Sequence, residues 1–221
     1  NKEYKYYALK GFLNPRVLDW TEEELQRVFS LDMPQEDFLC LAILACTGAR
    51  LDEIALLEWD QFEKGITKGG EWVHWLDTTD AIVKNEPSRR LIPILPKVAE
   101  LIKHHPRGLN KKEPNRLFTW PKDKADGKSE NKSSRALMQH LRKVSTDEDF
   151  VVHGLRHTVT TMLRIEKMDW EMREFMLGRG GKGEGANYGK AARVEEYLDE
   201  MRELDISFLD GQKVITKQIT L

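Results

Sequence analysis

The stretch that decides the fold is VVHGLRHTVTTM, residues 151–162, which places His153, Arg156 and His157 within five positions. We predict a helix from His153 to Ile165, so that the two histidines lie one turn apart near its start. Histidines at this spacing can bind a metal ion, stack within a core, or stand with the arginine around a bound anion. The rest of the chain has to distinguish among these three interpretations.

The composition is that of an ordinary globular protein, since 40% of the 221 residues are hydrophobic and 33% are charged. The longest strongly apolar run, FLCLAILAC from Phe38, is much too short to cross a bilayer, and the first residues lack a signal-peptide pattern. Cys40 and Cys46 in that run are expected to be reduced, buried thiols. We therefore expect a cytoplasmic protein without a membrane segment. The missing initiator methionine indicates a fragment or a processed product.

Basic residues are concentrated in one part of the chain, although the formal net charge is only −2. Residues 97–143 contain 13 lysines and arginines against 5 acidic residues, whereas the remainder contains 22 basic and 32 acidic residues. A lysine-rich segment is often a solvated loop, but this asymmetry also fits a basic face that contacts a polyanion.

Helical signals dominate the sequence. Thr21 and the three glutamates after it have the form of a capping box, and Gly48 permits a break after the helix that follows Pro34. The segments EWVHWLD (71–77) and SRRLIPI (88–94) are strand-like. We predict a mainly helical α+β fold with a small antiparallel sheet of two or three strands. The helices are expected at 21–30, 34–47, 96–105, 134–144, 153–165, 170–177 and 191–203, with a short one after Arg50.

Two ligand interpretations are weak. The glycine-rich segment 178–189 contains a Gly-x-Gly-x-x-Gly pattern, but a dinucleotide site needs a strand before it and a helix opening within it. This segment follows a helix and leads into more loop, so we interpret it as a mobile or tightly turned connection. A zinc helix would need a glutamate between its histidines, and here Arg156 would repel a dication. We therefore expect no metal ion and no cofactor.

Tyr188 follows the glycines and is flanked by Asn187 and Gly189. The common interpretation is a surface tyrosine, because phenol, with a pKa of about 10, is a poor nucleophile. It becomes useful beside cations that stabilise phenolate and the attacked anion. Arg50 and Arg156 could supply such cations, since a planar guanidinium can hold two phosphate oxygens. Taken alone, Arg50 could equally form an ordinary ion pair with Asp52 or Glu53.

An ordered series of motifs resembles the catalytic domain of the tyrosine recombinases, also called the phage integrase family. TGARLDEIALLEW is similar to the segment with that family's first arginine, and VKNEPSRRLIPI is similar to its β-hairpin lysine segment. HGLRHTVTTML is similar to its His-x-x-Arg box. LGRGGKGEGANYGK is similar to the Leu-Gly-His box that leads to the nucleophile. The resemblance covers about residues 18–201.

The resemblance implies a role for six residues: Arg50, Lys84, His153, Arg156, Arg179 and Tyr188. Tyr188 would attack a DNA phosphodiester, and Lys84 would protonate the departing 5′-oxygen. Arg50 and Arg156 would clamp the non-bridging oxygens, and His153 would assist proton movement at the tyrosine. No metal ion or ATP would be required.

Arg179 departs from the family pattern, which usually has histidine or tryptophan after Leu-Gly. An arginine can donate to a phosphate oxygen but cannot act as an acid. His157 is expected to have a structural role. Tyr197 is the rival nucleophile, but its helix also carries Val194, Leu198 and Met201, which favours packing.

The resemblance also implies how the chain is organised. We expect residues 1–17 to be a linker remnant, residues 18–205 to be the catalytic domain, and residues 206–221 to be a C-terminal tail that docks as a strand in cis or in trans. The amino-terminal domain with which relatives clamp DNA is expected to be missing.

The expected function is that of a site-specific DNA recombinase, or integrase, that works through a 3′-phosphotyrosyl intermediate. Its partners would be double-stranded DNA attachment sites and a homotetramer on synapsed DNA, in the cytoplasm of a bacterial or phage-infected cell, at the nucleoid. The alternatives are type IB topoisomerase-like relaxation and a DNA-binding domain with impaired cleavage.

Overall fold

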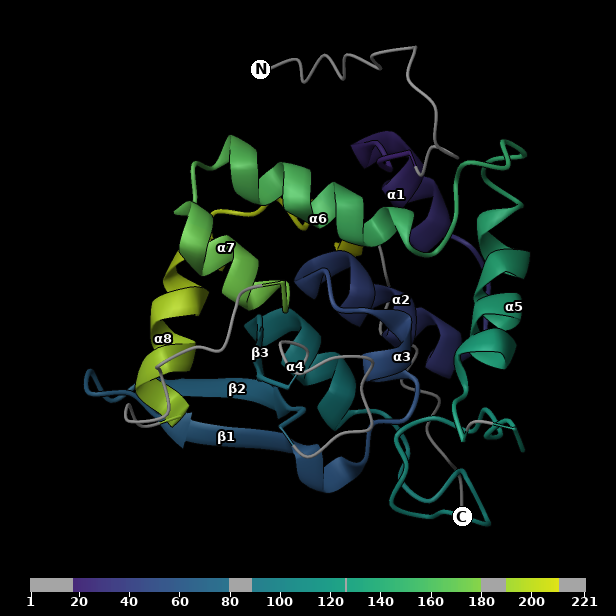
Figure 1. The fold of residues 1–221 in the computed structure, drawn as a ribbon, viewed down its shortest axis with the longest axis horizontal. Helices are drawn as coiled ribbons and strands as arrows, with labels where there is room; N and C mark the ends of the chain where they lie inside the picture. Colours follow the sequence, from purple (N-terminus) through teal and green to yellow (C-terminus); the bar gives the residue numbers. More distant parts are fainter. Residues whose placement is uncertain (1–17, 80–88, 126, 180–189, 211–221) are drawn as a thin grey trace.

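A central helix, α2 (Gln35–Thr47), organises the molecule, and other helices pack around it on several sides (Figure 1). The computed structural model describes residues 18–79, 89–125, 127–179 and 190–210, without the side chains of residues 130 and 190–193. Ten of the thirteen residues of α2 are buried, which agrees with its apolar sequence. Within the described residues, no helix is both long enough and apolar enough to span a membrane.

The capping signals in the sequence are realised at the start of the first helix and at the end of the second. Thr21 caps α1 (Glu22–Phe29): its hydroxyl accepts from the Glu24 amide at 3.2 Å, while the Glu24 carboxylate accepts from the Thr21 amide at 2.9 Å. Gly48 ends α2 in the left-handed region, with φ of 64°. A side chain at Gly48 would be strained by this conformation and would also collide with Leu177, whose Cδ2 lies 2.7 Å from the position of an added Cβ.

The sheet has three antiparallel strands in the order β1 (Phe62–Ile66), β2 (Trp72–Asp77) and β3 (Leu91–Ile94). Phe62 pairs with Leu76 in the first ladder, and Leu76 pairs with Ile92 in the second. Helix α8 (Lys190–Met201) packs across all three strands (Figure 1). The prediction of a mainly helical α+β fold with a small antiparallel sheet is confirmed.

The remaining helices complete a single hydrophobic core. Helices α4 and α6 pack directly on α2, and α5 packs on the short α3 as well as on α2. The bounds of these helices are α3 Leu51–Ile54, α4 Pro96–Lys103, α5 Glu130–Leu141, α6 Gly154–Ile165 and α7 Trp170–Met176, with 3₁₀ turns at Trp59–Gln61 and Ser207–Leu209.

Three details differ from the predicted elements. Helix α5 begins at Glu130, four residues before the predicted start. Strand β1 was not recognised, because it is a partly exposed edge strand that contains Lys64 and Gly65. At the start of the predicted tail, Ser207–Leu209 form a 3₁₀ turn, and Phe208 stacks on Phe29 of α1 with ring centroids 5.1 Å apart. The predicted strand at 213–221 lies outside the described residues.

Candidate phosphate-binding site

Arg156 lies in the first turn of α6, yet its guanidinium is directed at the carboxyl ends of two other helices. Its Nη1 donates to the Gly48 carbonyl at 2.7 Å, and its Nη2 donates to the Leu177 carbonyl. Gly48 and Leu177 are the C-caps of α2 and α7, where helix dipoles place partial negative charge. The side chain is held there at 2% exposure, so a buried positive charge joins the ends of two helices.

Arg50 is the N-cap of α3 and is fixed by Glu53, three residues later. The Glu53 carboxylate accepts from the Arg50 amide at 2.8 Å and from Arg50 Nη1 at 2.9 Å. Both terminal nitrogens of Arg50 also lie 3.4 Å from the Gly178 carbonyl. Because Glu53 is only 2% exposed, this is not the ordinary surface ion pair that the sequence also allowed.

Arg90, just before β3, completes the arrangement. Its Nη1 and Nη2 donate to the two Glu53 oxygens at 3.1 and 3.2 Å, and its Nε donates to the Met176 carbonyl at 2.8 Å. Three consecutive carbonyls at the end of α7, those of Met176, Leu177 and Gly178, are therefore bonded to Arg90, Arg156 and Arg50 in turn. These carbonyls have no partner within the helix, and three guanidinium groups supply the missing donors.

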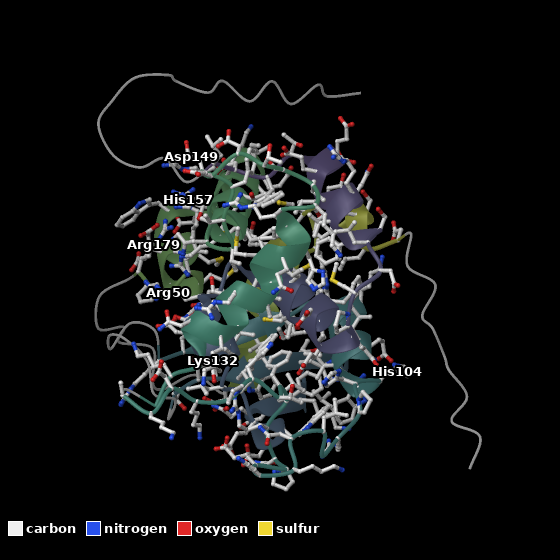
Figure 2. All side chains as sticks on the ribbon, turned by 90° about the vertical axis from the view of Figure 1, so that its right-hand side faces the viewer. Arg50, His104, Lys132, Asp149, His157 and Arg179 are labelled. Atoms are coloured by element: carbon white, nitrogen blue, oxygen red, sulfur yellow. The ribbon has the colours of Figure 1, made fainter. Side chains whose placement is uncertain are left out.

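Arg179 and the two histidines lie at the surface of the same region. Figure 2 shows Arg50, Arg179 and His157 along one edge of the molecule and His104 on the opposite side. The rings of His153 and His157 meet edge to face with centroids 5.3 Å apart. Arg179 has a distant acidic neighbour, Glu174, at 3.8 Å. We call Arg50, Arg90, Arg156 and Arg179, together with His153 and His157, the cationic cluster.

Burial and the surrounding positive charge lower the pKa values of Arg156 and His153 within the cationic cluster. Burial, together with the charges of Arg50 and Arg179, lowers the pKa of Arg156 to about 9. Partial desolvation, His157 and the arginines around it lower the pKa of His153 to about 4. Burial tends to raise the pKa of Glu53, but Arg90 and Arg50 outweigh it and hold that pKa below its usual value. Mutual repulsion of this kind is relieved by a bound anion.

The structure brings together four of the six residues predicted for the site: Arg50, His153, Arg156 and Arg179. Lys84 and Tyr188 lie outside the described residues. The rival tyrosine, Tyr197, is partly buried and packs against the hydrophobic core. Among the described residues, no group of three or more His, Cys, Asp or Glu side chains is placed to hold a metal ion.

Sequence reasoning missed Arg90 and underrated two other residues. Glu53 was interpreted only as a surface partner, and His157 only as structural, although burial and the charges of Arg179 and Arg156 lower the pKa of His157. A carboxylate three residues after Arg50 was a visible signal. Arg90 had no such signal, since its neighbour Arg89 has the same chemistry but is exposed.

The fold and the cationic cluster define a mainly helical α+β domain with a cationic site. The model of the phage integrase family matches residues 19–183, so the chain belongs to this family, the tyrosine recombinases. The predicted resemblance is thereby confirmed. No curated protein sequence matches the chain.

Solved structures show the same fold at low sequence identity. XerA recombinase has a TM-score of 0.53 and 14% identity over 91% of this chain and 64% of its own. The integrase from mycobacterium phage Brujita has a TM-score of 0.51 and 14% identity over 89% of this chain and 60% of its own. The Tn1549 transposon integrase, in complex with circular intermediate DNA, has a TM-score of 0.50 and 15% identity over 86% of this chain and 63% of its own. The chain thus spans less than two thirds of the length of these relatives.

Proposed function

We propose that the protein is a site-specific DNA recombinase that cleaves and rejoins strands through a 3′-phosphotyrosyl intermediate. The observation that carries the proposal is the convergence of Arg50, Arg156 and Arg179 beside His153, with Glu53 as the buried carboxylate among them. Phosphoryl transfer requires mainly alignment and stabilisation of charge, and this cluster offers both. Membership of the phage integrase family and the DNA-bound Tn1549 relative support DNA as the substrate.

The proposed chemistry begins with attack of the Tyr188 oxygen on the phosphorus of a phosphodiester. The phenol loses its proton, a bond forms between its oxygen and phosphorus, and the bond from phosphorus to the 5′-oxygen breaks. Lys84 gives a proton to the departing 5′-oxygen, so that a free 5′-hydroxyl results. The 5′-hydroxyl of another strand then attacks the phosphotyrosine and restores a phosphodiester and a phenol, which conserves the bond energy.

The cluster residues act on the phosphate. Arg50 and Arg156 stabilise the two non-bridging oxygens. Each terminal nitrogen of Arg156 carries a second hydrogen beyond the one given to a carbonyl. His153, with its pKa lowered to about 4, is neutral at pH 7 in the free protein, and it would assist proton movement at Tyr188 once a bound phosphate raises that pKa. Arg179 adds a further hydrogen-bond donor at the rim of the cluster, but it cannot act as an acid at neutral pH because its guanidinium stays protonated.

The division of the chain into a catalytic domain and a carboxyl-terminal tail belongs to the same proposal. Residues 18–205 would form the catalytic domain, and the tail beyond them would dock on the same chain or on a neighbour within a tetramer on synapsed DNA. Closed rings of identical subunits arise when such head-to-tail contacts have a suitable rotation.

A trapping experiment tests the cleavage step. The protein is incubated with a pool of duplexes of randomised sequence, each nicked beside its central step, so that the short 5′-hydroxyl fragment diffuses away and the covalent adduct accumulates. Denaturant-resistant adduct that disappears in Tyr188→Phe and persists in Tyr197→Phe is the expected result. DNA binding without any adduct would instead indicate a DNA-binding domain, and relaxed circles without recombinant junctions would indicate topoisomerase-like activity.

A further inference from the structure

Arg90 lies just before β3 and is hydrogen-bonded to Thr78, the residue that follows β2. Its carbonyl accepts from the Thr78 amide at 3.0 Å and from the Thr78 hydroxyl at 2.8 Å, and its own amide donates to that hydroxyl at 3.2 Å. Thr78 and Arg90 are the residues between which the segment containing Lys84 begins and ends. These bonds therefore tie together the residues where the described chain leaves β2 and enters β3.

The side chain of Arg90 reaches two further parts of the site. Its two terminal nitrogens form a bidentate pair with Glu53, whose carboxylate also accepts from Arg50, and its Nε donates to Met176 at the end of α7. The side chain of Glu53 is fully buried, and that of Arg90 is only 9% exposed. All three guanidinium nitrogens of Arg90 thus donate to groups within the protein. Arg90 therefore connects Glu53 to the end of α7 and does not face a ligand.

Charge sharing gives this contact a second effect. Glu53 Oε1 lies 2.9 Å from Arg50 and 3.1 Å from Arg90, so one carboxylate serves two guanidinium groups and the trio keeps one net positive charge. Without Arg90, Glu53 would neutralise Arg50 alone, and Arg50 would have less attraction for a phosphate. Only a planar fork can bond both carboxylate oxygens and a carbonyl at once, so lysine cannot replace it.

We propose that Arg90 is a positioning residue, which holds Arg50, the ends of the Lys84 segment and the carboxyl end of α7 in one fixed arrangement for phosphoryl transfer. The inference rests on the proposed function and deepens it. Arg90 joins the three segments from which the first arginine, the lysine and the chain leading to the tyrosine come. Misplacement of about 1 Å in such an arrangement costs about 100-fold in rate.

The test separates geometry from charge with two variants and one matched control. Arg90→Lys keeps the charge but loses the fork, Arg90→Gln loses both, and Arg89→Gln removes a charge from the adjacent exposed residue. The single-turnover rate of adduct formation at saturating DNA, the DNA dissociation constant and the thermal unfolding midpoint are measured for each. We expect Arg90→Lys to slow adduct formation by about 10- to 100-fold with DNA affinity within about threefold of the parent. We expect Arg90→Gln to lose rate and affinity, and Arg89→Gln to keep the parent rate.

A loss of adduct that only follows the loss of folded protein, or a rate at saturating DNA that equals the parent's, would overturn the positioning role.

Hydrogen exchange provides a readout that needs no cleavage. The Gly178 and Arg179 amides bond to the carbonyls of Phe175 and Glu174 at 2.9 and 2.8 Å, and we expect both to exchange faster in Arg90→Gln than in Arg89→Gln. Unchanged exchange there would refute the inference, whereas a parent protein that never forms adduct would refute only the proposed function.

Discussion

Arg116 and Arg156 are both almost fully buried, at 1% and 2% exposure, but they are held in different surroundings. Arg116 closes a loop: it donates to the carbonyls of Trp120 and Ala55 at 2.9 and 2.7 Å and pairs with Glu113 at 3.1 Å. Arg156 also donates to two carbonyls, but no carboxylate in the described part of the chain pairs with it directly, and its charged neighbours include Arg50 and Arg179. The charge of Arg116 is offset by the Glu113 carboxylate, whereas the charge of Arg156 is not offset by a directly bonded carboxylate among the described residues.

Burial alone therefore does not distinguish a structural arginine from one that serves a site. The surrounding charges do, because a protein that only needed to tie α2 to α7 would not benefit from placing four guanidinium groups together.

Arg156→Lys should nearly abolish adduct formation, with a fall of about 1,000-fold in the single-turnover rate. A lysine has one nitrogen and cannot hold both helix ends and a phosphate oxygen. The same change leaves one buried carbonyl without a donor, so the free energy of unfolding should fall by about 1–3 kcal/mol. Adduct yield from nicked duplexes and urea denaturation measure the two effects, and a rate within tenfold of the parent would contradict the role of Arg156.

Arg116→Met should show the opposite pattern. Loss of its donors leaves the Ala55 carbonyl buried and without the Arg116 hydrogen bond, while the Trp120 carbonyl keeps its bond from the Ser129 hydroxyl at 3.1 Å, so the free energy of unfolding should fall by about 1–3 kcal/mol. The adduct rate per folded molecule should stay within about twofold of the parent. If that rate fell sharply while the protein remained folded, the contrast between the two arginines would be wrong.

His153 should report the charge of the cluster through its titration. In the free protein, its NMR midpoint should lie near pH 4, below the ordinary value of about 6.5. Since the unfolded chain binds this proton more readily, stability from the neutral ring is complete above pH 6.5 and is lost as the pH falls towards 4. A bound DNA oligonucleotide should raise the midpoint by offsetting the arginine charges. His153→Gln assigns the signal, and a midpoint unmoved by DNA would argue against phosphate at this position.

Lys132→Ala should have the smallest effect. Lys132 is exposed on α5 and lies within the basic segment 97–143, so it should contribute one phosphate contact. DNA binding should weaken slightly for all sequences, and the dependence of log affinity on log salt should become shallower by about one unit. Lys103→Ala is the control, because Lys103 already pairs with Glu100 at 2.7 Å. Equal slopes for the two variants would exclude Lys132 from the DNA-binding surface.

The sequence predicted the parts of this molecule that depend on local chemistry. Thr21 and Glu24 predicted the start of the first helix, and Gly48 predicted the end of the second. The motifs around Arg50, His153 and Arg156 indicated the family. The role of Arg90 could not be predicted in the same way. Its partners, Glu53 and Met176, are 37 and 86 residues away, and only tertiary packing selects Arg90 over the adjacent Arg89. The direction of Arg156 was equally hidden, since a cation in the first turn of a helix opposes that helix's own dipole.

Gly48 shows how narrow the tolerance of this arrangement is. One added methyl group would meet Leu177 and the side chain of Val159, and it would force apart the two helix ends that Arg156 joins. Every reactive group would remain in the sequence, yet the spacing between them would change. Attempts to retarget or evolve this protein should therefore keep position 48 unchanged, because a library that varies it would discard active designs for a reason unrelated to DNA recognition.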